Sequence, residues 1–228
     1  MTYEFSLVLP VQNQAEIINL VANQIVEILI KARINYQLVM VENGSTDKTL
    51  SILKKIAKKN KRIKITVSLP GYGRAVIQGL KNSDGKYIGY MPSDGQCDAT
   101  VLPKVFAAVQ KKSVDLVKVY RTSRESLMRK YVSKVFNLLA NLCFNLKVRD
   151  INASPTVFAA KNLRRLKLES SDSFLDTELL IKARKLHWKI IRLPMKNFNR
   201  SGGRSTVKPT IVFEFLKNMI SWRFCGKL

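Results

Sequence analysis

Short apolar segments alternate with amphipathic segments through the first half of the chain, and this alternation constrains the fold more than any other feature. The first, Phe5–Pro10, is a nearly continuous apolar run of strand length, as expected for a strand buried on both faces of a sheet. The next segment, Ala15–Ala32, is predicted to be a helix because its apolar residues recur at spacings of three and four: Ile17, Val21, Ile25 and Ile28. The pattern predicts an α/β domain with a mainly parallel central sheet and helices on both faces.

The same alternation continues along the chain. Further strands are expected at Tyr36–Val41, Ile63–Val67 and Tyr87–Met91. Past the fourth strand the pattern loosens, and we expect helices over residues 100–111, 127–146 and 176–187 and strands over residues 114–119 and 189–193. A length of 228 residues suits one core of this class better than two.

Polar turns follow three of the predicted strands directly: Pro10–Gln14, Glu42–Asp47 and Pro92–Asp98. The carboxyl ends of parallel strands meet at one edge of a sheet, and ligands of such folds bind at that edge. We therefore expect these three turns to lie side by side and to form the binding site.

The turn Glu42–Asp47 suits a ligand-binding loop and also an ordinary strand-to-helix connection. Gly44 allows the backbone to turn sharply, and Ser45 or Thr46 can cap the next helix. The carboxylate of Glu42, at the mouth of a parallel sheet, can accept hydrogen bonds from a base or a ribose. The turn alone does not decide between the two interpretations.

Two further turns carry groups that suit phosphate chemistry. Gly71 and Gly73 open a predicted helix, whose N-terminus favours an anion, although a simple loop is an equal alternative. Asp94 follows the fourth strand, and a carboxylate there suits a divalent cation that bridges a diphosphate. Asp98, in contrast, is expected to cap the next helix.

The charge balance is unusual. Forty Lys and Arg against 16 Asp and Glu give a formal net charge of +24, which calls for an anionic partner unless the surface only reflects the host's composition. Nucleic acid is not the expected partner, because no aromatic–basic interleaving is present. Three widely spaced cysteines exclude a disulfide framework and favour a reducing cytoplasm, and the single histidine, His187, is interpreted as a surface residue. We expect neither a transmembrane helix nor a signal peptide.

The C-terminal part of the chain is strongly basic. From Lys182 to Leu228, twelve Lys and Arg stand against one acid, Glu214. We predict one domain over residues 1–206 and a basic amphipathic tail over residues 207–228, with the apolar face of the tail in an anionic membrane surface. The alternative is a helix packed on the domain. On the first interpretation the protein is cytoplasmic and peripheral, on the inner face of the membrane.

Eight segments, in order along the chain, form a recognisable combination: Leu7–Asn13, Val41–Asp47, Gly71–Ala75 with Gly79, Asp94–Gln96, Tyr120-Arg121, Arg149–Asn152, Glu178 and Arg200–Ser205. Together they resemble the family 2 glycosyltransferases of the GT-A fold. Within that family the sequence looks most like the polyprenol-phosphate sugar synthases, such as dolichol-phosphate mannose synthase. The resemblance covers roughly residues 5–206 and implies a nucleotide-diphospho-sugar donor.

The resemblance also implies roles for individual residues at the donor. Four would border or lie near the nucleoside: Pro10, Gln12, Glu42 and Ser45. Asp94 matches the second aspartate of the family's Asp-x-Asp motif, which holds Mg²⁺ or Mn²⁺, and Gln96 matches a residue that contacts the donor phosphates or sugar. The sequence departs from the family at Pro92, which replaces the first aspartate of that motif.

The same resemblance implies residues for the acceptor and the reaction. Arg121 and Arg200 match arginines near the diphosphate and the acceptor phosphate, where a bidentate guanidinium suits both. Asp150 completes the predicted catalytic set of Asp94, Arg121, Asp150 and Arg200. The predicted reaction is inverting transfer of the sugar to a polyprenyl phosphate, which is already an oxyanion at pH 7.

Two alternatives stay open from the sequence. A saccharide acceptor in surface-glycan assembly would require a carboxylate base, for which Asp150 and Glu178 are the candidates. For each of these, a structural ion pair with a neighbouring Arg or Lys is the equal alternative. A catalytically inactive relative that only binds a nucleotide sugar is the second, because Pro92 removes one carboxylate from the metal motif.

Overall fold

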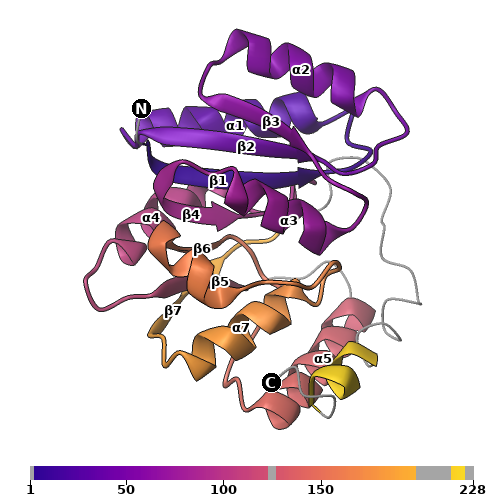
Figure 1. Cartoon of the computed structure of the whole chain (residues 1–228), viewed down its shortest axis with the longest axis vertical. Helices are drawn as coiled ribbons and strands as arrows, with labels where there is room; N and C mark the ends of the chain where they lie inside the picture. Colours follow the sequence, from indigo (N-terminus) through magenta and orange to yellow (C-terminus); the bar gives the residue numbers. More distant parts are fainter. Residues whose placement is uncertain (1–2, 123–126, 199–216, 224–228) are drawn as a thin grey trace.

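The computed structural model describes residues 3–122, 127–198 and 217–223 (Figure 1). Seven strands of these residues form one sheet in the order β3-β2-β1-β4-β6-β5-β7. Their bounds are β1 Tyr3–Val11, β2 Tyr36–Glu42, β3 Ile63–Val67, β4 Gly85–Tyr90, β5 Leu116–Arg121, β6 Thr156–Ala159 and β7 Ile190–Met195. The predicted α/β architecture is confirmed, and four of the six strand pairings are parallel.

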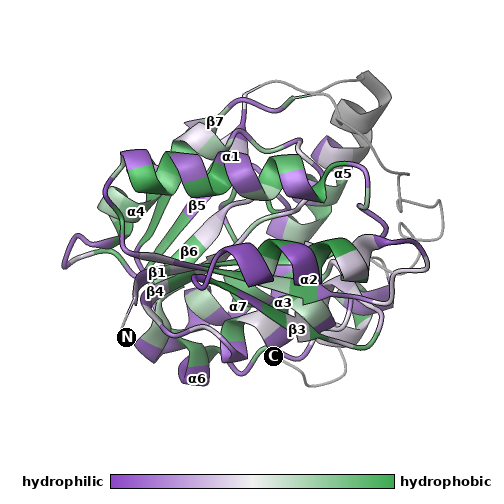
Figure 2. Cartoon of the chain, turned by 90° about the horizontal axis from the view of Figure 1, so that it is seen from above, coloured by the Kyte–Doolittle hydropathy of each residue, from purple (hydrophilic) through white to green (hydrophobic). Residues whose placement is uncertain are grey.

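Helices cover both faces of the sheet, as predicted (Figure 2). They are α1 Ile18–Lys31, α2 Thr49–Lys59, α3 Tyr72–Lys81, α4 Leu102–Val109, α5 Leu127–Phe144, α6 Leu163–Leu166 and α7 Leu175–Lys185, with 3-10 turns at Ala99–Val101 and Ala160–Asn162. Apolar residues of α1, α2 and α4 pack on one face, and those of α3, α5 and α7 pack on the other.

The double covering explains the apolar run in β1. Leu7 and Leu9 belong to one core cluster, whereas Val8, which points to the opposite face, belongs to the other. Successive side chains of a strand alternate between the faces, so a strand covered on both sides is apolar at nearly every position. The exception, Ser6, donates its hydroxyl to Gln37 Oε1 at 2.7 Å. β1 lies inside the sheet between β2 and β4, and its residues from Phe5 to Val11 are all buried.

One strand was not predicted. β6 runs antiparallel to both of its neighbours, β4 and β5, in the interior of the sheet. It comprises four residues, TVFA, and so short an apolar run has no period that separates a strand from a turn of helix. The sheet is therefore mixed around β6 and parallel elsewhere.

The helix at residues 217–223 corrects part of the expectation for the tail. Met219 and Trp222 are buried, and the Trp222 ring lies 5.9 Å from that of Phe174. Lys182 Nζ is 5.3 Å from the centre of the same indole. The alternative of a helix packed on the domain is therefore correct for these seven residues, while the proposed boundary at 206/207 lies outside the described residues.

No helix within the described ranges is both long enough and apolar enough to cross a membrane.

The N-terminus of α3 is not the anion site that the paired glycines suggested. The backbone N–H groups of Gly73 and Arg74 donate to the carbonyl oxygen of Ser171, at 3.0 and 3.3 Å. A Cβ atom on Gly73 would lie 2.1 Å from the carbonyl oxygen of Ser170. The glycine is required because a later loop of the same chain packs directly on its backbone.

We predict that Gly73→Ala destabilises the protein by about 1–3 kcal/mol, because the added methyl forces the backbone at Ser170 to move. In an unobstructed helix the same change gains about 1 kcal/mol, so the sign is diagnostic. Urea unfolding followed by circular dichroism measures the difference, and Lys81→Ala, at the exposed end of α3, serves as the control. Equal or higher stability of the Gly73 variant would contradict the described contact.

Candidate functional site

The turns after β1 and β2 are joined by hydrogen bonds at the carboxyl edge of the sheet. Asn13 donates its backbone N–H to Ser45 Oγ at 3.1 Å and accepts from the Thr46 N–H through Oδ1 at 2.8 Å. Asn13 has a φ of +51°, a conformation that asparagine tolerates better than most residues. The first two of the three predicted turns therefore lie side by side.

Asp47 performs the capping role that the sequence assigned to Ser45 or Thr46. Its Oδ1 accepts from the Thr49 N–H at 2.9 Å at the start of α2, and its Oδ2 accepts from the Ala15 N–H at 3.2 Å. The positive end of the helix dipole also stabilises a carboxylate at this position. Ser45 and Thr46 are instead engaged with Asn13, so the predicted cap was wrong.

The turn after β4 joins the other two. Ser93 donates its hydroxyl to the carbonyl oxygen of Pro10 at 2.7 Å, and both groups are buried. Asp94 follows directly and is itself buried, with Oδ1 accepting from the Gln96 N–H at 3.1 Å. The predicted convergence of three strand-end turns is thus confirmed, and Glu42 and Asp94 lie at the same edge of the sheet. Asp98 accepts from the Thr100 N–H at 3.0 Å, so its predicted cap is also confirmed.

Within this edge, Glu42 supports its own turn. Its side chain is buried, and Oε1 accepts from the backbone N–H of Ser45. Beside it, Pro10 is buried, while Gln12 and Ser45 are half-buried. The four residues predicted to border a nucleoside therefore occupy adjoining turns, and the role itself stays a prediction.

A fourth turn belongs to the same edge and was not assigned to it from the sequence. Asn43 Oδ1 accepts from the Gly71 N–H at 2.9 Å and from Ser68 Oγ at 3.4 Å. This ties the connection between β3 and α3 to the end of β2. The signal was available, because the strand-end rule applies to β3 as it does to β2.

Arg121, at the end of β5, forms a bidentate ion pair with Asp150. Nε donates to Oδ2 at 2.9 Å and Nη2 donates to Oδ1 at 2.8 Å, while the Arg121 backbone N–H reaches Oδ2 at 3.2 Å. Burial alone would lower the pKa of Arg121, but the hydrogen bonds and charge of Asp150 outweigh it and raise the pKa. The structural ion pair, which the sequence left as an alternative for Asp150, is therefore present.

Glu178 is not available as a base. It is fully buried, and its carboxylate accepts from the backbone N–H groups of Glu169 and Ser170 at 2.9 and 2.7 Å. Lys182 Nζ lies 2.6 Å from the same carboxylate. The prediction of Glu178 as a candidate base is wrong, because its carboxylate is buried and bonded to these three donors.

Cys97 marks the place where the predicted catalytic residues gather. The pKa of its thiol is raised to about 12, chiefly by burial and then by the charge of Asp94; the charge of Arg121 lowers it, and that of Asp150 raises it. The thiol donates to the carbonyl oxygen of Ser154 at 3.3 Å. The charges of three of the four predicted catalytic residues, Asp94, Arg121 and Asp150, thus affect the pKa of this one thiol.

Arg200, the fourth, lies outside the described residues. The chain that leads to it nevertheless reaches this edge: the Phe198 N–H donates to the carbonyl oxygen of Gln96 at 2.9 Å, and Asn197 forms a bridge with Cys97. The segment therefore runs next to the turn that carries Asp94.

Below the turns lies a buried ion pair that the sequence analysis missed. Lys118 Nζ on β5 contacts Asp176 Oδ1 on α7 at 2.8 Å, and both side chains are almost completely buried. Tyr90 donates its hydroxyl to the same carboxylate at 2.9 Å, and Lys118 also donates to Thr156 Oγ1 at 3.0 Å. A lysine inside an apolar strand, LVKVYR, is the signal that could have revealed it.

We predict that Lys118→Met and Asp176→Asn each destabilise the protein by about 3–5 kcal/mol, because each leaves a buried charge without its partner. The double variant should be less destabilised than the sum of the two, since it removes both charges. Urea unfolding of the four proteins gives the coupling energy. Strict additivity would contradict a direct interaction between the two side chains.

The thiol of Cys97 supplies a second prediction. With its pKa raised to about 12, its thiolate fraction at pH 8 should be about a thousandfold smaller than that of an ordinary thiol. We expect iodoacetamide at pH 8 to alkylate the exposed Cys143 in the folded protein and to reach Cys97 only after unfolding in urea. Peptide mass spectrometry measures both, and equal rates in the folded state would contradict the described environment.

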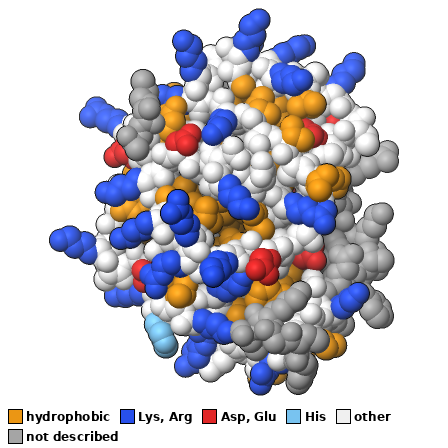
Figure 3. All heavy atoms as spheres, viewed as in Figure 1, with side chains coloured by type: hydrophobic (Ala, Val, Ile, Leu, Met, Phe, Trp, Pro, Cys, Tyr) orange, Lys and Arg blue, Asp and Glu red, His pale blue; other side chains and the backbone are white. Residues whose placement is uncertain are grey.

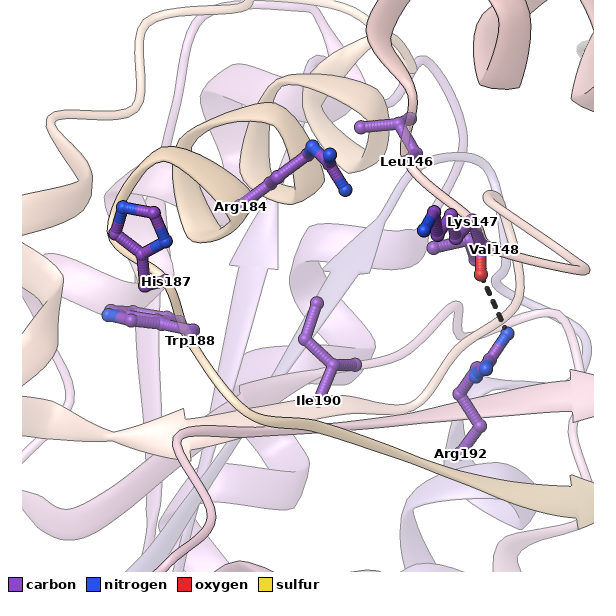
Figure 4. Close-up of a pocket in the computed structure, with 8 residues that line it drawn as sticks. All are labelled: Leu146, Lys147, Val148, Arg184, His187, Trp188, Ile190 and Arg192. Atoms are coloured by element: carbon purple, nitrogen blue, oxygen red, sulfur yellow. Dashed lines mark hydrogen bonds between the residues drawn. The ribbon is translucent and has the colours of Figure 1, made fainter.

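Described cavities of similar volume lie at different places, and one of about 380 Å³ adjoins the turn that carries Asp94, with Pro92, Gly95 and Cys97 in its lining. Another, of about 420 Å³, is lined by Leu146, Lys147, Val148, Arg184, His187, Trp188, Ile190 and Arg192 (Figure 4). Ile190 begins β7, whose carboxyl end at Met195 pairs with Arg121, so the cavity lies toward the opposite edge of the sheet. His187 is exposed, which confirms its prediction as a surface residue. The converging turns, and not the size of a cavity, locate the candidate site.

Comparison with known proteins decides the family. The model of the family described as "Glycosyl transferase family 2" matches residues 6–166, from β1 to α6. The chain belongs to glycosyl transferase family 2. Its prediction as a glycosyltransferase is confirmed, and the matched range contains the three converging turns and the Arg121–Asp150 pair.

Relatives and solved structures of this family 2 glycosyltransferase agree with the assignment. Dodecaprenyl-phosphate galacturonate synthase of Rhizobium johnstonii is 24% identical over 170 residues, which cover 72% of this chain and 50% of that protein. An uncharacterised glycosyltransferase of Mycobacterium tuberculosis is 27% identical over 192 residues, which cover 82% of this chain and 85% of that protein. The chain thus spans half the length of the Rhizobium relative.

The fold also matches solved structures. Glucosyl-3-phosphoglycerate synthase of M. tuberculosis, in complex with UDP, superposes with a TM-score of 0.74 at 17% identity, covering 96% of this chain and 79% of that chain. The same enzyme in complex with Mn²⁺, UDP and phosphoglyceric acid gives a TM-score of 0.71. The predicted GT-A fold is confirmed.

Proposed function

We propose that this family 2 glycosyltransferase transfers a sugar, with inversion, from a nucleotide-diphospho-sugar to a polyprenyl phosphate at the cytoplasmic surface of a membrane. The observation that carries the proposal is the engagement of both candidate bases: Asp150 by Arg121 and Glu178 by backbone donors and Lys182. An acceptor that needs no base suits such a site. A phosphate monoester is one, because its second pKa is about 6.

The donor half of the proposal rests on the converging turns. Pro10, Gln12, Glu42 and Ser45 would border the nucleoside, and Asp94 and Gln96 would lie at the diphosphate. The hydrogen bonds from Asn13 and Ser93 hold these turns together before any ligand binds, so little ordering remains for the donor to induce. Solved structures of the same fold contain UDP or UDP-glucose, which supports a nucleotide sugar as the donor.

A divalent cation fits this site only together with the donor. Asp94 provides one carboxylate, Pro92 provides none, and no group of three or more His, Cys, Asp or Glu side chains within the described residues is placed to hold a metal. Mg²⁺ commonly takes one or two protein carboxylates and completes its shell with substrate phosphates and water. Bound in this way, the cation would neutralise the departing nucleotide diphosphate.

Arg121 is proposed to help the cation neutralise the departing nucleotide diphosphate. It lies at the end of β5, and its fork is aligned by Asp150, so its orientation is fixed before the donor binds. Arg200 is proposed for the acceptor phosphate, with the segment 197–198 bringing the chain to Gln96. The polyprenyl acceptor is supported by the Rhizobium relative, which is named as a dodecaprenyl-phosphate synthase.

The test is a transfer assay with radiolabelled UDP- and GDP-sugars, Mn²⁺ and polyprenyl phosphate in detergent. We expect label to enter the organic phase, and Asp94→Asn to lower turnover by about 10²–10³-fold, because it removes the cation's carboxylate. Asp98→Asn, four residues away, is the matched control, since Asp98 only caps the following turn.

Three outcomes would contradict the proposal. Label that stays in water-soluble product would indicate a saccharide or another phosphorylated acceptor. Binding of a nucleotide sugar without turnover, detected by thermal shift, would indicate an inactive relative. Unchanged turnover in the Asp94 variant would remove Asp94 from the reaction.

A further inference from the structure

The helix α5 exposes a continuous apolar stripe. Four of its side chains are exposed by more than a third, although they are apolar: Val135 56%, Leu138 59%, Leu139 36% and Leu142 72%. Their spacings of three and four residues place them on one side of the helix. Isolated apolar residues are common on protein surfaces, but a contiguous group of this kind marks a contact site.

The stripe is distinct from the side by which α5 joins the protein. Ala140 and Phe144 are buried in the core cluster on that face of the sheet, and Phe136 packs against it. Asn141 adds two hydrogen bonds to the backbone of Val148, at 2.8 and 3.0 Å. The helix is therefore anchored on its inner side, and its outer leucines are not required to hold it.

The charges around the stripe indicate what covers it. Lys134, next to Val135 on α5, is exposed, and the sequence of α5 contains no acidic residue. Lys147 and Arg149, just past its end, are exposed as well. Basic side chains also dominate the face of the molecule shown in Figure 3, where acids are few. A second copy of this chain would bring like charges to the same stripe, whereas an anionic lipid surface supplies both apolar and negative groups.

The position of α5 connects the stripe to the site. The helix begins at Leu127, six residues after Arg121. Asn137 Oδ1 accepts from the Ile151 N–H at 3.0 Å, and Ile151 follows Asp150, the partner of Arg121. A surface that binds α5 is thus connected, through Asn137 and Ile151, to Asp150, which aligns the arginine proposed to meet the diphosphate.

We propose that the Val135–Leu142 stripe of α5 is the membrane-contacting surface of the protein and that its partner is an anionic bilayer. The link between this surface and a lipid acceptor rests on the proposed function. The membrane contact itself does not depend on it. It replaces part of the contact that the sequence placed in the tail, because Met219 and Trp222 of residues 217–223 are buried against the protein. The stripe inserts among the acyl chains while the flanking Lys and Arg meet anionic headgroups.

The test is flotation with vesicles of phosphatidylcholine containing phosphatidylglycerol, compared with phosphatidylcholine alone. Leu138→Ser/Leu142→Ser should weaken partition to the anionic vesicles by about tenfold or more, because two exposed apolar side chains are lost from the contact. The matched control is Leu20→Ser/Ile30→Ser on α1, whose side chains are 55% and 56% exposed, and it should bind as the wild type does. Thermal unfolding verifies that both variants are folded.

Unchanged vesicle binding of the α5 variant overturns the proposal, and so does equal loss in the α1 variant. A change of the α5 variant from dimer to monomer in light scattering, with vesicle binding intact, assigns the stripe to a second copy and also overturns it. Turnover on a water-soluble short-chain isoprenyl phosphate separates this inference from the proposed function. If the wild type binds vesicles through α5 but never glycosylates that acceptor, the proposed function is wrong, whereas the proposal of a membrane-contacting surface is supported.

Discussion

The site depends on the hydrogen bonds made by the turn that ends β1. This strand lies between β2 and β4, and groups at its end bond to the turns after both neighbours: the carbonyl of Pro10 with Ser93, and Asn13 with Ser45 and Thr46. Parallel register alone brings strand ends to one edge. The side-chain bonds add a fixed spacing between the turns, so the candidate donor residues form a prepared surface.

A second constraint lies beneath that surface. The carboxylate of Asp176 on α7 receives Lys118 from β5 and Tyr90 from β4, and Lys118 reaches Thr156 on β6. Tyr90 ends the strand that leads to Asp94, and Lys118 precedes Arg121 by three residues on its strand. Buried polar groups tolerate little displacement because each lost bond is costly in a medium without water. The network therefore holds two strands whose ends carry proposed phosphate-binding residues.

The sequence predicts features that depend on neighbouring residues and misses those that depend on residues far apart in the chain. Apolar runs, helical spacing and the polar residues after β1, β2 and β4 are local patterns, and they predicted the sheet and the meeting of its turns. β6 has too few residues for a pattern, and the pairings of Lys118 with Asp176 and of Gly73 with Ser171 join residues far apart in the chain. For the glycines of the Gly71 turn, the sequence accordingly left an anion site and a simple loop as equal alternatives. The nucleoside and metal roles of Glu42 and Asp94, argued from their places after the strands and from the family resemblance, stay predictions.

The contact of Ser170 and Ser171 with α3 bears on how the polypeptide is divided. The family match ends at residue 166, yet the carbonyl of Ser171 receives the first N–H groups of α3, and Asp176 neutralises a lysine in the middle of the sheet. Residues 170–185 thus complete the N-terminal half of the molecule, although they lie beyond the shared family pattern. A segment cut at residue 166 would therefore lack the backbone that packs on the start of α3 and the carboxylate that pairs with Lys118.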